Sequence, residues 1–405
     1  MLGKMKLFIF CSSLSGGKGG AERIATNLVS EMINRGHDVY VGYNGYKDPA
    51  YTQDSKAILT PWNRKKSIEH YQKKVIELNP DCCFVLYFGR SLMEHRKMFS
   101  ISGIPFGMQE CTNPKRLCYN NWINKTDRKG LPVWEREMIA SSAARIRMVM
   151  PGYEKSFPPY IRQNVRAFPN SVPSVQHRAK PSGQNTAIKK IIIIGGLKKH
   201  KNLTLLIKSF SRLSTDYPEW EIHDYGIKFD EKNQYHHEIS ELLIKYGIKN
   251  NIIFHGPVDD IFPEYAGSHI HAITSLSEGC PTAVLEAMAH GLPSIGISSC
   301  PGTNDLIHHN KNGILVDYDK DGEGLAKGLH TLMSSPSLRD DMGDQAHIDS
   351  KLYRNKEVYD QWENLFREMI SYKHSPDKLL HEQKAIDYER AMHMVRCRQK
   401  YLRMD

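Results

Sequence analysis

The first 43 residues contain an apolar run, a glycine-rich loop, a helical pattern and a second apolar run, in that order. The two runs are Lys6–Cys11 and Asp38–Tyr43; four glycines fall within residues 16–20, and apolar residues recur at helical spacing over 21–35. A strand, a helix and a strand joined in this way form a parallel βαβ unit. The sequence therefore predicts an open α/β sheet that binds its ligand at the carboxyl ends of the strands.

The same alternation of strands and helices recurs from residue 189, after a segment rich in Pro, Ser and Lys. We therefore expect two tandem Rossmann-like domains, each with a parallel sheet, facing a cleft, and a helical C-terminal tail. The expected boundaries are an N-terminal domain over 1–170, a linker over 171–187, a C-terminal domain over 188–350, a helix over 351–374 that crosses back to the first domain, and a basic helical tail over 375–405. A short helix is also expected at 303–308.

Two carboxylates stand eight residues apart in the stretch 275–293. Glu278 precedes a Gly-Cys-Pro turn, and Glu286 lies within a predicted helix over 282–290 that ends at a glycine. Backbone N–H groups at such a helix start can hold an anion, so a phosphate is expected near residues 280–283. The alternative is a helix that begins in this way with no ligand bound.

Cations follow the strand at 189–196, where Lys198, Lys199 and Lys201 lie in the loop before the next helix. Ammonium groups at the carboxyl end of a strand suit a pyrophosphate. A solvated basic turn is the alternative for Lys198 and Lys199, and less so for Lys201.

The first half of the chain offers two further candidate positions. Gly17, Gly19 and Gly20 allow a close approach of the backbone to a ligand, although the same glycines suit a flexible loop. Glu110 follows a predicted strand and can reach a substrate hydroxyl or cap the next turn.

Charge and composition narrow the classes of protein. Residues 1–180 carry 28 Lys and Arg against 14 Asp and Glu, which favours an anionic partner such as a phospholipid surface or a lipid pyrophosphate. There is no long apolar span, no signal-peptide pattern and no CxxC pair, which predicts a cytoplasmic protein without disulfides or zinc. The letters of Asp319-Lys-Asp321 resemble a metal motif, but an Asp at a helix start is commonly a cap, so no metal site is predicted.

Several segments resemble the retaining GT-B glycosyltransferases of the group-1 (family 4) type. The segment from Ser277 to Pro293 is similar to that family's E-x7-E signature, and Gly19-Gly-Ala-Glu-Arg23 resembles its first-domain loop. Further similar landmarks are Phe254-His-Gly256, Asn312-Gly-Ile-Leu-Val316 and Phe168-Pro-Asn-Ser-Val172.

The resemblance implies a nucleotide sugar, UDP-linked, as co-substrate, with no cofactor and no metal. It implies that Glu286 binds the ribose, that Glu278 binds the donor sugar, and that Lys201 stabilises the leaving pyrophosphate. The stretch of Gly279, Cys280, Pro281 and Thr282 would meet the phosphate and sugar through its amides, with Lys198 and Lys199 beside it.

Two positions depart from the family pattern. Gly196 stands where the family usually has an arginine that partners the lysine, so Lys198 or Lys199 would have to substitute. In the first domain the family often has a histidine near the reacting sugar, whereas this chain offers Glu110.

The sequence thus favours a glycosyltransferase that acts on a glycan or polyprenyl-linked acceptor in cell-surface polysaccharide or lipopolysaccharide assembly. It would associate peripherally with the inner face of the membrane, and no nucleic-acid partner is expected. The alternatives are a non-catalytic sugar-nucleotide or polyanion binding subunit, and an epimerase or phosphorylase on the same fold.

Overall fold

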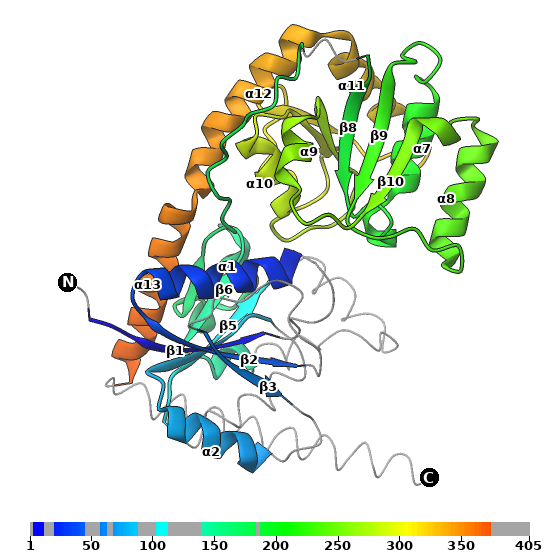
Figure 1. Cartoon of the computed structure of the whole chain (residues 1–405). Coiled ribbons are helices and arrows are strands. Elements are labelled where there is room, and N and C mark those ends of the chain that lie inside the picture. Colours follow the sequence, from blue (N-terminus) through cyan, green and yellow to red (C-terminus); the bar gives the residue numbers. More distant parts are fainter. Residues whose placement is uncertain are drawn as a thin grey trace. The chain divides into compact units, whose positions relative to one another are not determined.

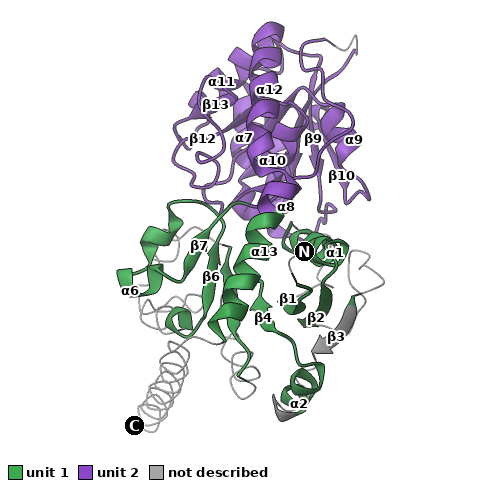
Figure 2. Ribbon diagram, turned by 90° about the vertical axis from the view of Figure 1, so that its left-hand side faces the viewer, with its two compact units in different colours: residues 1–169, 359–405 green, residues 170–358 purple. Residues whose placement is uncertain are grey.

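The structure is a computed structural model, and it describes residues 3–11, 20–44, 57–62, 68–87, 103–111, 139–183 and 187–373. The chain forms two compact units, and each is described by itself (Figure 2). Unit 1 comprises residues 1–169 and 359–405, and unit 2 comprises residues 170–358. Unit 2 is therefore inserted between two segments of unit 1.

Unit 1 is built on a seven-stranded parallel sheet with the order β3-β2-β1-β4-β5-β6-β7 (Figure 1). Its strands are β1 (Lys6–Cys11), β2 (Asp38–Asn44), β3 (Ile58–Trp62), β4 (Cys82–Val85), β5 (Phe106–Glu110), β6 (Arg145–Met148) and β7 (Val165–Ala167). Its helices include α1 (Gly20–Asn34), α2 (Ile68–Leu78), α6 (Pro159–Arg162) and, from Tyr359 onward, α13 (Asn355–Tyr372). The expected βαβ start of the chain is confirmed.

The C-terminal helix α13 packs against the sheet of unit 1 through aromatic residues. Trp362 and Phe366 are 2% and 0% exposed, and both meet Phe84 of β4 edge to face, with ring centroids 5.1 and 5.8 Å apart. A Cβ at Gly107 of β5 would lie 2.6 Å from Cδ2 of Phe84 and 2.7 Å from the sulfur of Met369, so a side chain there would displace the ring or the methionine that pack at this point. The last turns of α13 thus complete the core of unit 1.

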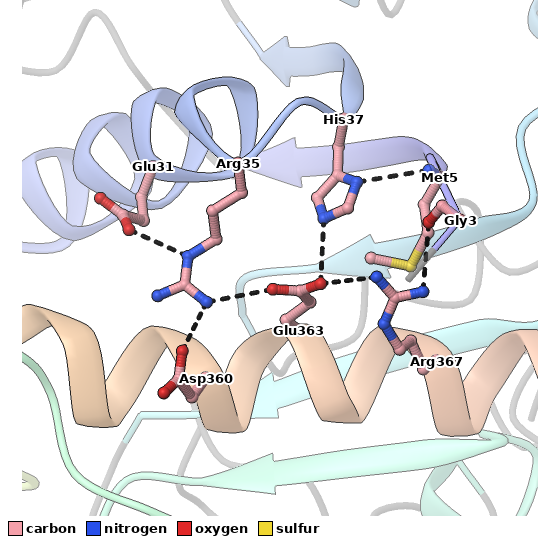
Figure 3. A network of polar contacts seen from close by, with 8 residues as sticks. All are labelled: Gly3, Met5, Glu31, Arg35, His37, Asp360, Glu363 and Arg367. Atoms are coloured by element: carbon pink, nitrogen blue, oxygen red, sulfur yellow. Dashed lines mark hydrogen bonds and ion pairs between the residues drawn. The ribbon is translucent and has the colours of Figure 1, made fainter. Parts of the chain in front are cut away.

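Charged groups fix α13 to the first βαβ unit as well (Figure 3). The Arg35 guanidinium contacts carboxylate oxygens of Glu31, Asp360 and Glu363 at 2.9, 2.6 and 3.0 Å. Glu363 also pairs with Arg367 at 2.6 Å and lies 3.5 Å from His37 Nε2. Burial lowers the pKa of His37, whose Nδ1 accepts from the Met5 N–H, so this imidazole is neutral at pH 7.

Unit 2 contains a six-stranded parallel sheet with the order β10-β9-β8-β11-β12-β13. Its strands are β8 (Lys189–Ile194), β9 (Trp220–Tyr225), β10 (Ile252–Gly256), β11 (Ile270–Ile273), β12 (Ser294–Ile297) and β13 (Gly313–Val316). Its α-helices are α7 (Leu203–Ser211), α8 (Gln234–Lys245), α9 (Phe262–Ala266), α10 (Thr282–Ala289), α11 (Glu323–Ser334) and α12 (Pro336–Ser350).

Both faces of this sheet are covered by helices, because successive apolar residues of β8 point to opposite faces. Ile191 and Ile193 pack in one core with α7, α8 and α11, whereas Ile192 packs in a second core with Tyr265 of α9 and Ala287 of α10. Continuous apolar strands such as β8 are typical of a parallel sheet buried on both sides. The expectation of two Rossmann-like sheets is therefore confirmed.

Two local expectations are corrected. Residues 301–306 form turns in place of the short helix expected at 303–308. The Asn312 side chain accepts from the His308 N–H and donates to the Leu306 carbonyl, so these groups do not continue a helix. The segment 171–187, expected as a linker, lies within unit 2. There the Ala179 N–H donates to the His290 carbonyl at 2.8 Å, and Val172 N–H donates to the Tyr353 carbonyl.

The basic tail expected over 375–405 lies outside the described residues. Among the helices of the described ranges, none has both the length and the apolar character needed to cross a bilayer.

Candidate active site

The two strands at the middle of the unit 2 sheet create a place for a ligand. β8 and β11 are neighbours, but the chain continues from β8 to β9 on one side and from β11 to β12 on the other. The loops that follow these strands therefore diverge, and open α/β sheets bind ligands at such a switch point. Lys201 follows β8 and Glu278 follows β11, so both lie at this point.

Lys201 and Glu278 form an ion pair, although 77 residues separate them in sequence. Lys201 Nζ lies 2.7 Å from Glu278 Oε1, and the two side chains are 20% and 14% exposed. The Thr274 hydroxyl donates to the Lys201 carbonyl at 2.7 Å, and the Glu278 N–H donates to the Pro301 carbonyl at 3.1 Å. The backbone on both sides of the pair is thus fixed.

Gly302 packs directly against the backbone of the Glu278 loop. Its φ is +81°, and a Cβ there would lie 2.6 Å from the Gly279 carbonyl oxygen and 2.9 Å from the carbonyl group of Glu278. Only glycine accommodates both the conformation and the contact. This residue was not identified from the sequence. The sequence signal that could have found it is its position directly after a proline that follows a buried strand.

Helix α10 begins where the sequence predicts. Thr282 is its first residue and Pro281 its N-cap, which has no side-chain capping bond. Asn170 fixes the preceding turn, because its Nδ2 donates to the Cys280 carbonyl at 3.0 Å. Cys280 and Pro281 are buried, whereas Gly279 and Thr282 are partly exposed. The first N–H groups of the helix have no partner within the helix and can meet an anion.

Glu286 lies one turn further along α10 and is 8% exposed. The hydroxyl of Tyr265 on α9 lies 3.0 Å from Glu286 Oε2. Tyr265 was not identified from the sequence, since it is 21 residues away and has no pattern of its own.

Lys198 and Lys199 point elsewhere than Lys201. Both are exposed and line a pocket of about 650 Å³. The rest of that lining comes from Leu197, His200, Ile227, Lys228, Asp230, Asn233, Gln234, Tyr235, His236 and Glu238. Lys201, by contrast, is paired with Glu278. The three lysines are therefore not brought to one point.

The absence of a side chain at residue 196 has a local cause. The Gly196 N–H donates to Asp224 Oδ1 at 2.7 Å, and a Cβ on Gly196 would lie 2.9 Å from that oxygen. Asp224 is fully buried at the end of β9, and this burial raises the pKa of its carboxyl to about 7. A carboxylate thus occupies the space beside Gly196, and Asp224 anchors the loop that leads to Lys201.

The unit 1 candidates are only partly described. Glu110 is the last residue of β5 and is buried, at 2% exposure. Gly20 is the first residue of α1 and is exposed, whereas Gly17 and Gly19 lie outside the described residues.

The acidic pair at 319–321 belongs to a helix start. The Asp319 carboxylate accepts N–H bonds from Asp321, Gly322, Glu323 and Gly324, and these bonds lower its pKa. Within the described ranges, no group of three or more His, Cys, Asp or Glu side chains is arranged to hold a metal ion.

Comparisons with known proteins agree on one class of protein. Residues 176–348 match the family model described as glycosyl transferases group 1. An uncharacterized glycosyltransferase of Haemophilus influenzae is 24% identical over 364 residues, which cover 86% of this chain and 97% of the relative. The amylovoran biosynthesis glycosyltransferase AmsD of Erwinia amylovora is 21% identical over 374 residues, which cover 89% of this chain and 99% of that protein.

Solved structures show the same fold. The structure of Anabaena HepE in complex with UDP-glucose superposes with a TM-score of 0.71 at 14% identity, covering 89% of this chain and 99% of that one. This similarity extends over both units and identifies the architecture as GT-B.

Proposed function

We propose that the protein is a retaining, metal-independent glycosyltransferase. The match of residues 176–348 to the family model of glycosyl transferases group 1 supports this proposal. It would move a sugar from a nucleotide diphosphate to a glycan or lipid-linked acceptor in cell-surface polysaccharide or lipopolysaccharide assembly. The observation that carries the proposal is the Lys201–Glu278 ion pair at the β8/β11 switch point, beside the start of α10.

In the proposed site each group has a task set by its chemistry. Glu286 binds the ribose hydroxyls, and Glu278 binds a hydroxyl of the donor sugar. The free N–H groups at the start of α10 hold the diphosphate, where an anion is favoured. Lys201 stabilises the negative charge that develops on the leaving diphosphate, because Glu278 already holds its ammonium group in position.

The proposed reaction exchanges one C–O bond for another. The bond from the anomeric carbon to the diphosphate oxygen breaks, and the acceptor hydroxyl forms a new bond on the same face of the sugar. The hydroxyl proton passes to the departing phosphate oxygen. In unit 1, Glu110 is proposed to orient the acceptor hydroxyl, and the loop containing Gly17, Gly19 and Gly20 to approach the acceptor.

Two kinds of similarity support the donor and the product class. HepE was solved with UDP-glucose, which supports a UDP-linked donor. AmsD is named for amylovoran biosynthesis, which supports a polysaccharide product. The basic first half of the chain favours an anionic acceptor at the inner face of the membrane, since each basic residue near a leaflet contributes about 1 kcal/mol.

The test is nucleotide release from a panel of nucleotide sugars by the purified full-length protein. Release from at least one donor is expected, and Glu278→Gln should lower it by about a hundredfold while the fold is retained. Glu323→Gln is the matched control, because this carboxylate lies on α11 and its side chain is 66% exposed. Undiminished release by Glu278→Gln would reject the proposed site, and no release from any donor would reject the proposed activity.

Membrane association has a separate test. Flotation with vesicles of neutral lipid and with vesicles containing anionic lipid should show binding to the anionic vesicles alone, and less of it at high salt. Equal binding to both would contradict the electrostatic basis of the proposal.

A further inference from the structure

Tyr265 contacts the carboxylate to which the proposed function assigns the ribose. Its side chain is 0% exposed, and its hydroxyl lies 3.0 Å from Glu286 Oε2 and 3.3 Å from the Ala283 carbonyl oxygen. A phenol has one proton to donate, and a carboxylate accepts more strongly than a neutral carbonyl. The hydroxyl therefore donates to Glu286.

His290 fixes the same glutamate through its backbone. Its Nδ1 lies 2.7 Å from the Glu286 carbonyl oxygen, which can only accept, so Nδ1 carries the proton. The His290 ring stacks on the Tyr265 ring with centroids 5.3 Å apart and an angle of 19° between the planes. The two stacked rings thus bond the side chain and the main chain of Glu286 together.

This arrangement restricts a side chain that would otherwise have several rotamers. A glutamate has three rotatable bonds, and a ligand that must order them loses affinity. With one carboxylate oxygen held by Tyr265, the direction of the other oxygen is set before a ligand arrives. A site prepared in this way distinguishes a ligand with the matching hydroxyl from one without it.

We propose that Tyr265 is a positioning residue that orients Glu286 and thereby gives the protein its preference for ribonucleoside over 2′-deoxyribonucleoside diphosphates. This inference rests on the proposed function, because it takes Glu286 to be the ribose-binding group. Tyr265 itself does not touch the nucleotide; it acts through the carboxylate.

The experiment compares Tyr265→Phe with the matched control Tyr225→Phe. Tyr225 is 3% exposed, lies in the same core, and donates to a carboxylate that has no part in the site, Glu264, at 2.6 Å. Each variant loses one oxygen atom and keeps its ring, so circular dichroism should be unchanged for both. Isothermal titration with UDP, GDP and ADP identifies the nucleotide that the native protein binds most tightly, and the corresponding 2′-deoxynucleotide is then titrated.

The native protein and Tyr225→Phe are expected to prefer the ribonucleotide by about tenfold or more, the value of one good hydrogen bond. Tyr265→Phe should reduce this preference by about tenfold, with the loss falling on the ribonucleotide. In a Glu286→Gln background, Tyr265→Phe should have no further effect on the preference, since the two residues act as one unit.

The outcomes separate this inference from the function on which it rests. If no nucleotide binds to the native protein, both are overturned. If the native protein discriminates and Tyr265→Phe discriminates equally well, the role of Tyr265 is rejected while the proposed function stands. An effect of Tyr265→Phe that persists in the Glu286→Gln background also rejects it, because the tyrosine would then act by another route.

Discussion

A single methyl group at Gly302 should disturb the Glu278 loop. The Cβ of Gly302→Ala would lie 2.6 Å from the Gly279 carbonyl oxygen, whereas ordinary contact begins at 3.4 Å, so the loop must move by about 0.8 Å. Alanine at a φ of +81° costs about 1–2 kcal/mol, and the crowding adds about 1–3 kcal/mol. We expect the free energy of unfolding to fall by about 2–5 kcal/mol.

The same displacement should lower activity, because the loop carries Glu278. A misplacement on the order of 1 Å can reduce catalysis about a hundredfold, and a similar decrease in kcat/KM is expected here. The assays are nucleotide release with the best donor of the panel and denaturation by urea. A change in kcat/KM is interpretable only under conditions in which the variant remains folded.

Gly247→Ala provides the control for backbone strain. Gly247 follows α8 with a φ of +67°, and no atom lies within 4 Å of the point that a Cβ would occupy there. This variant should lose about 1–2 kcal/mol and keep native kcat/KM. The reasoning is refuted if Gly302→Ala keeps more than about half of the native kcat/KM and is no less stable than Gly247→Ala.

Four further outcomes follow from the contacts described. Lys201→Met should lower kcat by about 10²–10³, the usual effect of removing a charge-stabilising donor, and a change in KM alone would contradict its role. Arg35→Met should reduce the free energy of unfolding by about 1–3 kcal/mol in urea titrations, because Glu363 loses a partner; an unchanged midpoint would argue against this network. Burial lowers the pKa of His269 to about 4 and that of His271 to about 3, whereas both titrate near about 6.5 in the unfolded chain. Below about pH 6.5 the unfolded chain therefore binds protons that the folded protein does not, and each histidine should lower the free energy of unfolding by about 1.4 kcal/mol per pH unit down to its folded pKa. Urea midpoints that do not change between pH 7 and 5 would contradict this. A chelator should leave nucleotide release unchanged, and restoration of a lost activity by added Mg²⁺ would show that the metal-independent mechanism is wrong.

Most elements of unit 2 could be predicted from the sequence, because apolar runs and helical periods alternate there with clear stop signals. The helix predicted over 282–290, for example, is α10 (Thr282–Ala289). β3 was missed because Ile58–Trp62 contains a proline, which argues against an interior strand. The structure explains the exception, since β3 lies at the edge of the sheet.

The site could be predicted only as far as local pattern and family resemblance extend. The spacing of Glu278 and Glu286 is local, and their positions relative to α10 agree with the prediction. The partners of these groups come from distant segments: Lys201 precedes Glu278 by 77 residues, and Tyr265 precedes Glu286 by 21. The helical and strand periods of the sequence do not predict contacts between such distant residues. Asp224 had one usable signal, since an ionisable residue stands at the end of an otherwise buried strand.

The return of α13 to unit 1 has a consequence for synthesis of the chain. Translation proceeds from the N-terminus, and domains generally fold as units while it continues. Residues 170–358 are contiguous, so unit 2 can fold as soon as it has left the ribosome. The strands of unit 1 are translated before unit 2, but their sheet lacks Trp362, Phe366 and the Glu363 carboxylate until the segment after unit 2 has emerged. The sheet of unit 1 is therefore completed after unit 2, although its strands are translated before it.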